Sequence, residues 1–397
     1  MPIVSISALG DRGDGIAHAE TGTLFVPFAL PGETAEVDAE GDRGTIRALL
    51  TNSPNRIEPF CPYFTTCGGC TLQHLGPTLY EGFKRGLVES ALVQAGITVA
   101  VEPLIEAHGE GRRRATLHVR DREAGYMRAR SHDLLNIETC PILVPSLAKA
   151  APTIARQIGG TVGDCDVSFT ATATGLDVAI KTEKRMGLQR LVPLAQRLQL
   201  ARLSLNGEPV LQTRPPAVRM GKATVELSIG GFLQATEAAE QALARLVLDG
   251  VGAAKSVADL FCGTGPFALR LAEKAKVFAA DSDKPAIAAL QAAVRHTQGL
   301  KPLTAASRDL FREPVVPFEL TGYDAVVFDP PRAGAEAQAR ELAKSKVKTV
   351  VAVSCEPKTF ARDAAILIAG GYRLETVTPV DQFAWSTHVE MVGVFRR

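Results

Sequence analysis

The pattern of apolar and polar residues changes twice along this chain of 397 residues. Residues 1–55 hold short runs rich in β-branched side chains, separated by Gly-Asp, Pro-Gly and Glu-Gly breaks. This pattern predicts a small OB-like β-barrel of four or five strands. The predicted strands are Ile3–Ala8, Thr23–Pro27, Thr34–Val37 and Thr45–Leu50. A β-rich adaptor without a ligand would give the same pattern.

The middle region, residues 56–225, combines helical spacing with strand-like runs. Residues Pro77–Ala95 have apolar side chains at helical spacing and are followed by Gly96, which predicts one amphipathic helix. The expected apolar face is Leu79, Phe83, Leu87, Ala91 and Leu92. Strand-like runs follow at Ala115–Val119, Val167–Ala171, Leu176–Ile180 and Ala201–Leu205. We therefore expect a mixed α+β central domain.

Residues 226–397 alternate continuous apolar runs with helical patterns, which is typical of a doubly wound, Rossmann-like α/β domain. The predicted pairs are Ser256–Phe261 with Ala268–Lys274, Val277–Asp281 with Ala286–Gln298, Ala325–Asp329 with Ala335–Ala343, and Thr349–Val353 with Phe360–Ala369. A last strand, His388–Phe395, is predicted at the edge of the sheet. The chain thus divides into three expected domains, 1–55, 56–225 and 226–397.

Composition indicates a globular protein, and the distribution of charge along the chain indicates a class of partner. A hydrophobic fraction of 46% and a charged fraction of 22% are normal for a globular protein. The net charge of +1 hides an acidic barrel and a basic middle region, since residues 181–222 carry nine Lys and Arg against two Glu. Such clustering, together with seven Arg in residues 112–130, suggests a polyanion-binding face, and a solvated charged surface is the alternative.

The sequence predicts a cytoplasmic protein with no membrane partner. We find no apolar run of eighteen residues and no signal-peptide pattern. The seven cysteines are odd in number and unevenly scattered, which does not suit a disulfide framework. A reducing compartment, in which thiols serve metals or catalysis, is the expected setting.

A glycine turn follows the first predicted strand of the last domain. Phe261 and Cys262 lead into Gly263-Thr264-Gly265, and a helix comes next. Glycines here let the backbone approach a ligand, and Asp281, about twenty residues later, is placed to bind ribose hydroxyls. The Gly-x-Gly spacing favours a nucleoside such as S-adenosylmethionine over a pyrophosphate, although a lone Gly-x-Gly is also common as a structural turn.

Two further strand ends and the last strand carry reactive groups. Asp329 begins a rigid Asp-Pro-Pro loop, and Cys355 stands between a strand and a helix, whose N-terminus lowers a thiol pKa. A buried structural cysteine is the alternative. Alternation places His388 and Glu390 on one face of their strand.

These groups suit methylation of uracil at C5. A thiolate that adds to C6 turns C5 into a nucleophile for a sulfonium methyl group, and a base must then remove the C5 proton. Cys355 suits the nucleophile and Glu390 the base.

Several motifs together resemble the bacterial RNA uracil-5-methyltransferases. The motifs are residues 259–267, 329–334, 354–357, 361–363 and 388–390. The resemblance implies a methyltransferase domain whose cofactor contacts include Gln234 of Phe232-Leu233-Gln234, and further contacts at Phe261, Asp281, Asp309 and Asp329. The chain departs from the family at Thr236, Pro266 and Glu356, where the family usually has Asn. Glu356 is expected to raise the pKa of the neighbouring Cys355 by charge repulsion.

Four cysteines suggest a metal centre in the middle region. Cys61, Cys67 and Cys70 form a tight triplet, and Cys140 follows later. Four thiolates suit Zn²⁺ or an iron–sulfur cluster, and the lack of two short Cys-x-x-Cys pairs favours the cluster. The motifs are similar to the [4Fe–4S] branch of the same family, which methylates 23S rRNA. The resemblance also implies that the barrel is a TRAM domain.

We therefore expect a monomeric, S-adenosylmethionine-dependent enzyme that methylates a uridine of 23S rRNA through a covalent cysteine–C6 adduct. Methylation of a tRNA uridine is the alternative within enzymes. A non-catalytic RNA-binding or assembly factor, suggested by the three departures, is the alternative from another class.

Overall fold

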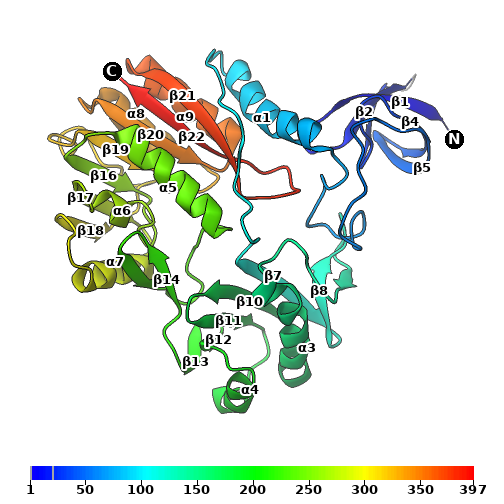
Figure 1. The fold of residues 1–397 in the computed structure, drawn as a ribbon, viewed down its shortest axis with the longest axis horizontal. Coiled ribbons are helices and arrows are strands. Elements are labelled where there is room, and N and C mark those ends of the chain that lie inside the picture. The colour runs from blue at the N-terminus through cyan, green and yellow to red at the C-terminus, as the bar shows by residue number, and fades with distance from the viewer. Residues whose placement is uncertain (1, 20–21) are drawn as a thin grey trace.

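The computed structural model describes residues 2–19 and 22–397 (Figure 1). The N-terminal segment forms a closed five-stranded barrel in the order β1-β2-β3-β5-β4, which confirms the predicted barrel. Its strands are β1 Ile3–Leu9, β2 Gly15–Ala19, β3 Gly22–Val26, β4 Thr34–Glu40 and β5 Arg43–Thr51. The sequence pattern missed β2, because a strand of only five residues that starts with Gly and contains His lacks a clear apolar alternation.

A seven-stranded sheet in the order β13-β12-β11-β10-β7-β8-β9 forms the centre of the chain. Its strands are β7 Arg114–Arg120, β8 Glu123–Met127, β9 Leu134–Asn136, β10 Cys165–Thr172, β11 Gly175–Lys181, β12 Arg202–Leu205 and β13 Glu208–Gln212. Three helices accompany it: α2 Pro145–Ala148, α3 Ala150–Val162 and α4 Val192–Arg197. Helix α3 packs on β7, β8 and β10, and Figure 1 shows α3 and α4 on the same side of this sheet. On β7 and β10, the face of the sheet opposite α3 carries mainly polar side chains.

The C-terminal segment forms an eight-stranded sheet in the order β18-β17-β16-β19-β20-β22-β21-β6. Its strands are β16 Ser256–Leu260, β17 Lys276–Asp281, β18 Leu303–Ser307, β19 Ala325–Phe328, β20 Thr349–Ser354, β21 Arg373–Asp381, β22 Glu390–Arg396 and β6 Ile105–Glu106. Its helices are α5 Glu237–Val251, α6 Ala268–Leu271, α7 Lys284–His296, α8 Glu336–Lys344 and α9 Pro357–Ala369. A hairpin of β14 Ala217–Met220 and β15 Ala223–Glu226 precedes them.

The last strand is not at the sheet edge, so this part of the sequence prediction is wrong. Strand β22 runs antiparallel between β20 and β21. The prediction failed because β21 contains Thr, Glu and Pro among its apolar residues and was not recognised as a strand. The five strands from β18 to β20 are parallel. The alternating pattern predicted four of them and missed β18, in which no side chain is fully buried.

Helix α1, Pro77–Gln94, packs against α9 and β21 of the C-terminal sheet, and β6 extends the same sheet. Helix α1 and strand β6 fall within the expected central domain, residues 56–225, but both are attached to the C-terminal sheet. The buried face of α1 also differs from the expected one, since it includes Tyr80, Lys84 and Val88. Lys84 is buried because it pairs with a carboxylate, which apolar periodicity does not reveal.

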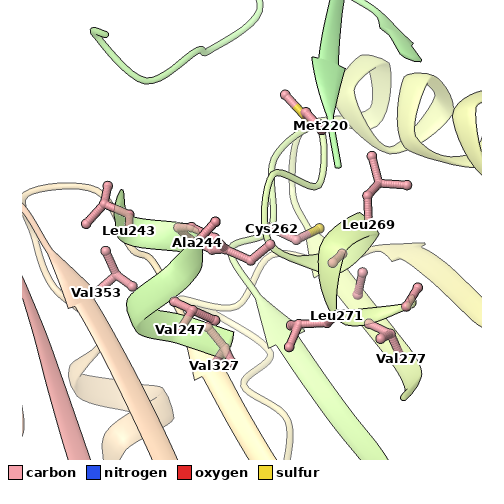
Figure 2. Packing of buried hydrophobic residues seen from close by; sticks show 14 of the residues in the cluster. Met220, Leu243, Ala244, Val247, Cys262, Leu269, Leu271, Val277, Val327 and Val353 are labelled. Carbon is pink, nitrogen blue, oxygen red and sulfur yellow. The ribbon is translucent and has the colours of Figure 1, made fainter. Parts of the chain in front are cut away.

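The largest core cluster lies where α5 and α6 cover the C-terminal sheet (Figure 2). Leu243 and Val247 of α5 belong to one buried cluster with Val327 of β19 and Val353 of β20. This packing fixes the carboxyl ends of the parallel strands, where open α/β sheets bind ligands. Among the described residues, no helix has the length and apolar character needed to cross a lipid bilayer.

Candidate active site

A cavity of about 330 Å³ opens at the carboxyl ends of the parallel strands. Its size fits a small-molecule site. Its lining includes seven of the predicted site residues: Gln234, Phe261, Gly263, Asp281, Asp329, Cys355 and Glu390. The structure therefore brings together residues from four strand ends, from the start of β22 and from the segment before α5.

Two predicted cofactor residues do not line this cavity. Gly265 has a φ of +88°, and a Cβ there would lie 2.5 Å from Leu290 Cδ1. Its role is the close packing of the turn on α7. Asp309 Oδ1 accepts hydrogen bonds from the backbone N–H groups of Phe311 and Arg312 at 3.1 and 3.4 Å. Asp309 thus shapes the loop that presents Phe311 to the cavity.

The glycine turn is held by the carboxylate at the end of β17. Asp281 Oδ2 accepts from the Gly263 N–H at 2.8 Å, and Oδ1 accepts from the Asp283 N–H at 2.8 Å. Phe261, directly after β16, has a φ of +59°, which is rare for a bulky residue and typical of constrained sites. Its ring lies edge-on to Phe311 at 5.4 Å. This half of the cavity offers an aromatic wall beside a backbone turn, which suits an adenosine group.

Cys355 directly follows β20, and Glu390 begins the neighbouring antiparallel strand β22. The register pairs Ser354 with Met391, which places Cys355 and Glu390 at the same end of the β20–β22 pair. Burial and the nearby charges of Glu390 and Asp329 raise the pKa of the Cys355 thiol to about 12. The expected lowering by the helix N-terminus is therefore wrong, because burial and two carboxyl groups outweigh the helix dipole. The charges that raise this pKa come from Glu390 and Asp329, rather than from the expected Glu356.

The two carboxyl groups beside the thiol hold protons more tightly than usual. Glu390 is 4% exposed, and burial together with the charge of Asp329 raises its pKa to about 8. Burial and the charge of Asp281 raise the pKa of Asp329 to about 7. A carboxyl group whose pKa is near neutrality is suited to take up and release a proton at physiological pH.

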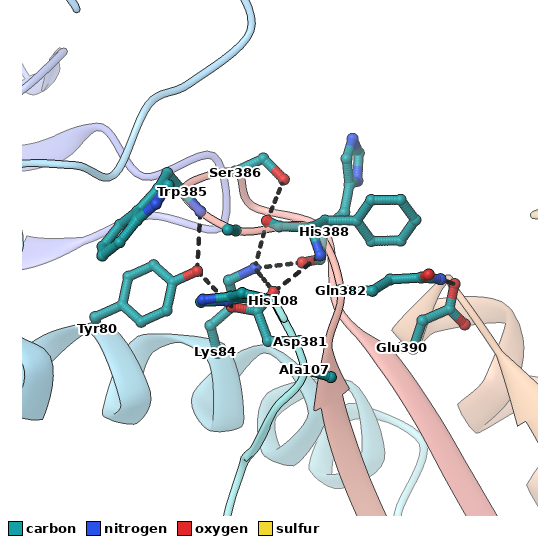
Figure 3. Close-up of polar contacts among 12 residues, drawn as sticks. Tyr80, Lys84, Ala107, His108, Asp381, Gln382, Trp385, Ser386, His388 and Glu390 are labelled. Atoms are coloured by element: carbon teal, nitrogen blue, oxygen red, sulfur yellow. Dashed lines mark hydrogen bonds and ion pairs between the residues drawn. The ribbon is translucent and has the colours of Figure 1, made fainter. Parts of the chain in front are cut away.

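A hydrogen-bonded pair of glutamines, Gln382 and Gln234, connects these carboxyl groups. Figure 3 shows Gln382 beside Glu390. Gln382 Nε2 donates to Glu390 Oε1 and to Gln234 Oε1, both at 2.7 Å. Gln234 Nε2 donates to Asp329 Oδ2 at 3.3 Å. Glu390, Gln234 and Asp329 thus belong to one hydrogen-bonded network that passes through Gln382.

The loop between β21 and β22 is anchored by a buried ion pair (Figure 3). Lys84 of α1, whose side chain is fully buried, donates to Asp381 Oδ1 at 2.9 Å and to the His388 carbonyl oxygen at 2.5 Å. Burial alone would raise the pKa of Asp381, but hydrogen bonds from His108 and Tyr80 and the charge of Lys84 hold it at about 2. These contacts fix the loop that leads into Glu390.

His388 does not share a strand face with Glu390, because β22 begins only at Glu390. The His388 ring contacts Arg332 Nη2, with the Nε2 atom at 3.1 Å. The alternation argument failed here because it assumed that the strand began two residues earlier.

The departures from the family pattern have structural roles. Thr236 Oγ1 accepts from the Ala239 N–H at 3.0 Å and caps α5, and the Glu356 side chain accepts from the Lys358 N–H at the start of α9. Both are ordinary N-cap contacts. Pro266 lines the cavity. None of these contacts removes a group from the site.

The four cysteines line a second cavity of about 230 Å³. Within residues 2–19 and 22–397, no group of three His, Cys, Asp or Glu side chains has the spacing of a metal site. The cavity nevertheless contains buried hydrogen-bond donors that have no acceptor among the described residues. Gln73 Nε2 and Arg112 Nε line it, and both are buried without a partner in the described structure. Thiols surrounded by unpaired donors fit an anionic sulfur-rich group.

Most of the basic residues predicted to bind a polyanion are exposed in residues 181–222, with Arg202 as the exception. Arg202 pairs with Asp177 at 2.7 Å. In the other basic run, Arg113 is buried, donates to the Gln234 carbonyl oxygen at 3.0 Å and pairs with Glu240. These two arginines are structural, which charge counting does not reveal.

The five parallel strands of the C-terminal sheet, the glycine turn after β16 and the acidic residue at the end of β17 define the class of α/β methyltransferases. A family model described as tRNA (uracil-5-)-methyltransferase matches residues 192–397. An RNA methyltransferase of Brucella suis is 47% identical over 408 residues, which cover 99% of this chain and 97% of the relative. The 23S rRNA (uracil(1939)-C(5))-methyltransferase RlmD of Pectobacterium atrosepticum is 31% identical over 417 residues, covering 99% and 93%.

The chain belongs to the tRNA (uracil-5-)-methyltransferase family and is an S-adenosylmethionine-dependent RNA (uracil-5-)-methyltransferase. The fold agrees over its whole length with that of the Pyrococcus abyssi tRNA (uracil-54, C5)-methyltransferase, which was solved with S-adenosyl-L-homocysteine. The TM-score is 0.78 at 24% identity, with 99% of each chain covered.

Sequence reasoning missed several residues of this site. Gln382 belongs to no motif, and a single Gln in a loop carries no signal of its own. Phe311 and Met220 line the cavity from segments distant in sequence. The exposure of the Phe311 side chain marks it as part of a binding surface, but this exposure is known only from the structure.

Proposed function

We propose that this protein transfers a methyl group to C5 of a uridine in 23S rRNA, with Cys355 as the nucleophile and Glu390 as the base. The observation that carries the proposal is one cavity lined by a thiol, a carboxyl group with a near-neutral pKa, and a nucleoside-type turn.

The proposed steps follow from the residues. Cys355 first releases its thiol proton to solvent; the thiolate Sγ then bonds to C6 of the uracil, and the π electron pair of the C5–C6 bond moves to C5. S-adenosylmethionine supplies a sulfonium methyl group, whose positive charge also offsets the carboxyl charges that raise the thiol pKa. After methyl transfer, C5 bears both a proton and the methyl group. Glu390 removes the proton, the C5–C6 double bond forms again, and the Sγ–C6 bond breaks.

The 23S rRNA assignment is supported by RlmD of Pectobacterium atrosepticum, whose similarity extends over the barrel and the cysteine segment. The exposed basic residues of the central sheet provide contacts for an RNA backbone. A tRNA substrate is the second candidate, because the family model and the Pyrococcus abyssi protein are both described as tRNA enzymes.

We also propose that Cys61, Cys67, Cys70 and Cys140 hold a [4Fe–4S] cluster and that the barrel is a TRAM domain. Two observations support the cluster: the four cysteines share one cavity, and Gln73 and Arg112 provide donors to it. The barrel lies next to the cysteine segment, since the ring centroids of Phe28 and Phe64 are 5.2 Å apart. Iron and acid-labile sulfide in anaerobically purified protein, lost in Cys70→Ser, test the cluster.

The decisive experiment incubates the purified enzyme with labelled cofactor and either undermethylated 23S rRNA or unmodified tRNA. We expect 5-methyluridine in the rRNA, loss of activity in Cys355→Ala, and retention in Cys165→Ala, which removes a buried cysteine outside the cavity. Product in tRNA alone would replace the substrate assignment. No product in either RNA, with Cys355→Ala equal to wild type, would refute the proposal.

A further inference from the structure

Gln382 lies at the junction between the base and the cofactor side of the cavity. It follows β21 directly and is 1% exposed. The register of the β21–β22 pair places Val380 opposite Glu390. Gln382 comes just after this strand end, and its amide reaches the Glu390 carboxyl group (Figure 3).

One backbone group fixes which way the Gln382 amide faces. The Ala235 N–H donates to Gln382 Oε1 at 2.8 Å. A flipped amide would set its NH₂ group against this N–H, donor against donor. Gln382 Nε2 therefore faces the other two neighbours, Gln234 Oε1 and Glu390 Oε1, each at 2.7 Å. An amide has two N–H bonds, and both are used.

The fixed amide makes the two oxygens of Glu390 inequivalent. Oε1 accepts from Gln382, which disfavours a proton on that oxygen. Oε2 is buried and has no hydrogen-bond partner in the described part of the chain. A proton that arrives at Glu390 is thus directed to Oε2.

The same amide sets the orientation of Gln234. Because Gln234 Oε1 accepts from Gln382, its Nε2 must face the other way, toward Asp329 Oδ2 at 3.3 Å. The donor that Gln234 offers to this side of the cavity therefore depends on Gln382. The chain of contacts runs from the Ala235 backbone to Glu390 on one side and to Asp329 on the other.

We propose that Gln382 is a positioning residue that makes Glu390 Oε2 the proton-accepting atom and fixes the Gln234 amide. This inference rests on the proposed function, in which Glu390 removes the C5 proton. Gln382 itself need not touch the substrate. It acts through the hydrogen bond to Oε1, which stabilises the carboxylate form of the base.

The test compares Gln382→Met, which keeps the size and removes the amide, with Gln382→Glu, which places a second carboxyl group against Glu390. The matched control is Gln338→Met. Gln338 is fully buried and makes two amide hydrogen bonds to the Val315 backbone, at 2.8 and 2.9 Å, outside the site. The control therefore loses a buried amide without disturbing the base.

Two readouts separate positioning from structural damage: the pH dependence of methylation, and the fraction of RNA covalently bound to protein on denaturing gels. For Gln382→Met we expect the acidic limb of the pH–rate profile to move up by about one pH unit, because one charged hydrogen bond is lost. We also expect at least a tenfold lower kcat and accumulation of the methylated adduct. Gln382→Glu should shift the limb further, and Gln338→Met should show neither effect.

An unmoved limb without adduct accumulation in Gln382→Met, at any level of activity, overturns the inference. A kcat that falls equally at every pH would show only a structural role and would overturn it as well. Failure of the proposed function is distinguishable, because the wild type itself would then make no 5-methyluridine and no Cys355-dependent adduct.

Discussion

Replacement of the base by its amide, Glu390→Gln, is the sharpest test of the division of roles between Cys355 and Glu390. The substitution keeps the size of the side chain, and the amide oxygen can still accept from Gln382 Nε2, which now donates to Oε1 at 2.7 Å. Only the ability to take a proton is removed. A general base contributes about 10²- to 10⁴-fold, so product release should slow by that factor.

The same substitution should favour the first step. The charge of Glu390 is the largest neighbouring charge that raises the pKa of the Cys355 thiol, so its removal makes the thiolate easier to form. Methyl transfer then proceeds while proton removal stalls. The enzyme should collect as a methylated covalent adduct with the RNA.

The assay is a denaturing gel with methyl-labelled cofactor, run beside a measurement of free 5-methyluridine. Glu390→Gln should give a labelled protein–RNA band and little product, and Cys355→Ala should give neither. Glu237→Gln, at an exposed position on α5, is the control that should match wild type. Loss of the adduct together with the product in Glu390→Gln, or undiminished turnover, would refute the assignment of the base.

Four further predictions concern pH and stability. The kcat should rise with pH up to about 8, since Glu390 removes the C5 proton only after losing its own proton. The folded state binds this proton more tightly than the unfolded state, whose pKa is near 4.5, so the melting temperature should fall as pH rises from 5 to 8, and less so in Glu390→Gln. Lys84→Met should cost about 3–5 kcal/mol in urea unfolding, because Asp381 would stay buried without its cation; a loss below about 1 kcal/mol would contradict this. Thr236→Ala should cost about 1 kcal/mol through loss of the α5 cap, with cofactor affinity unchanged by calorimetry.

The agreement between sequence and structure depends on how local each signal is. The glycine turn after β16, the acid at the end of β17 and the cysteine after β20 were all placed correctly, because the carboxyl ends of parallel strands meet at one sheet edge. Their convergence on one cavity follows from topology, which the alternating pattern already predicts.

Signals that depend on distant partners were misjudged. The thiol of Cys355 was expected to have a low pKa from its helix, whereas burial and the carboxyl groups of Glu390 and Asp329 raise it. Glu356 was expected to act on that thiol, whereas its side chain caps α9. A local pattern does not reveal which charges from other strands will surround a side chain.

The sequence by itself determined the barrel, four of the parallel strands and the chemical groups at their ends, because apolar periodicity and turn residues act over short distances. Only the tertiary structure decided that β21 pairs with β22, that Lys84 is buried against Asp381 and that Gln382 joins Glu390 to Gln234. These contacts connect residues up to 297 positions apart. The burial and charge that set the pKa of each group exist only once the chain has folded.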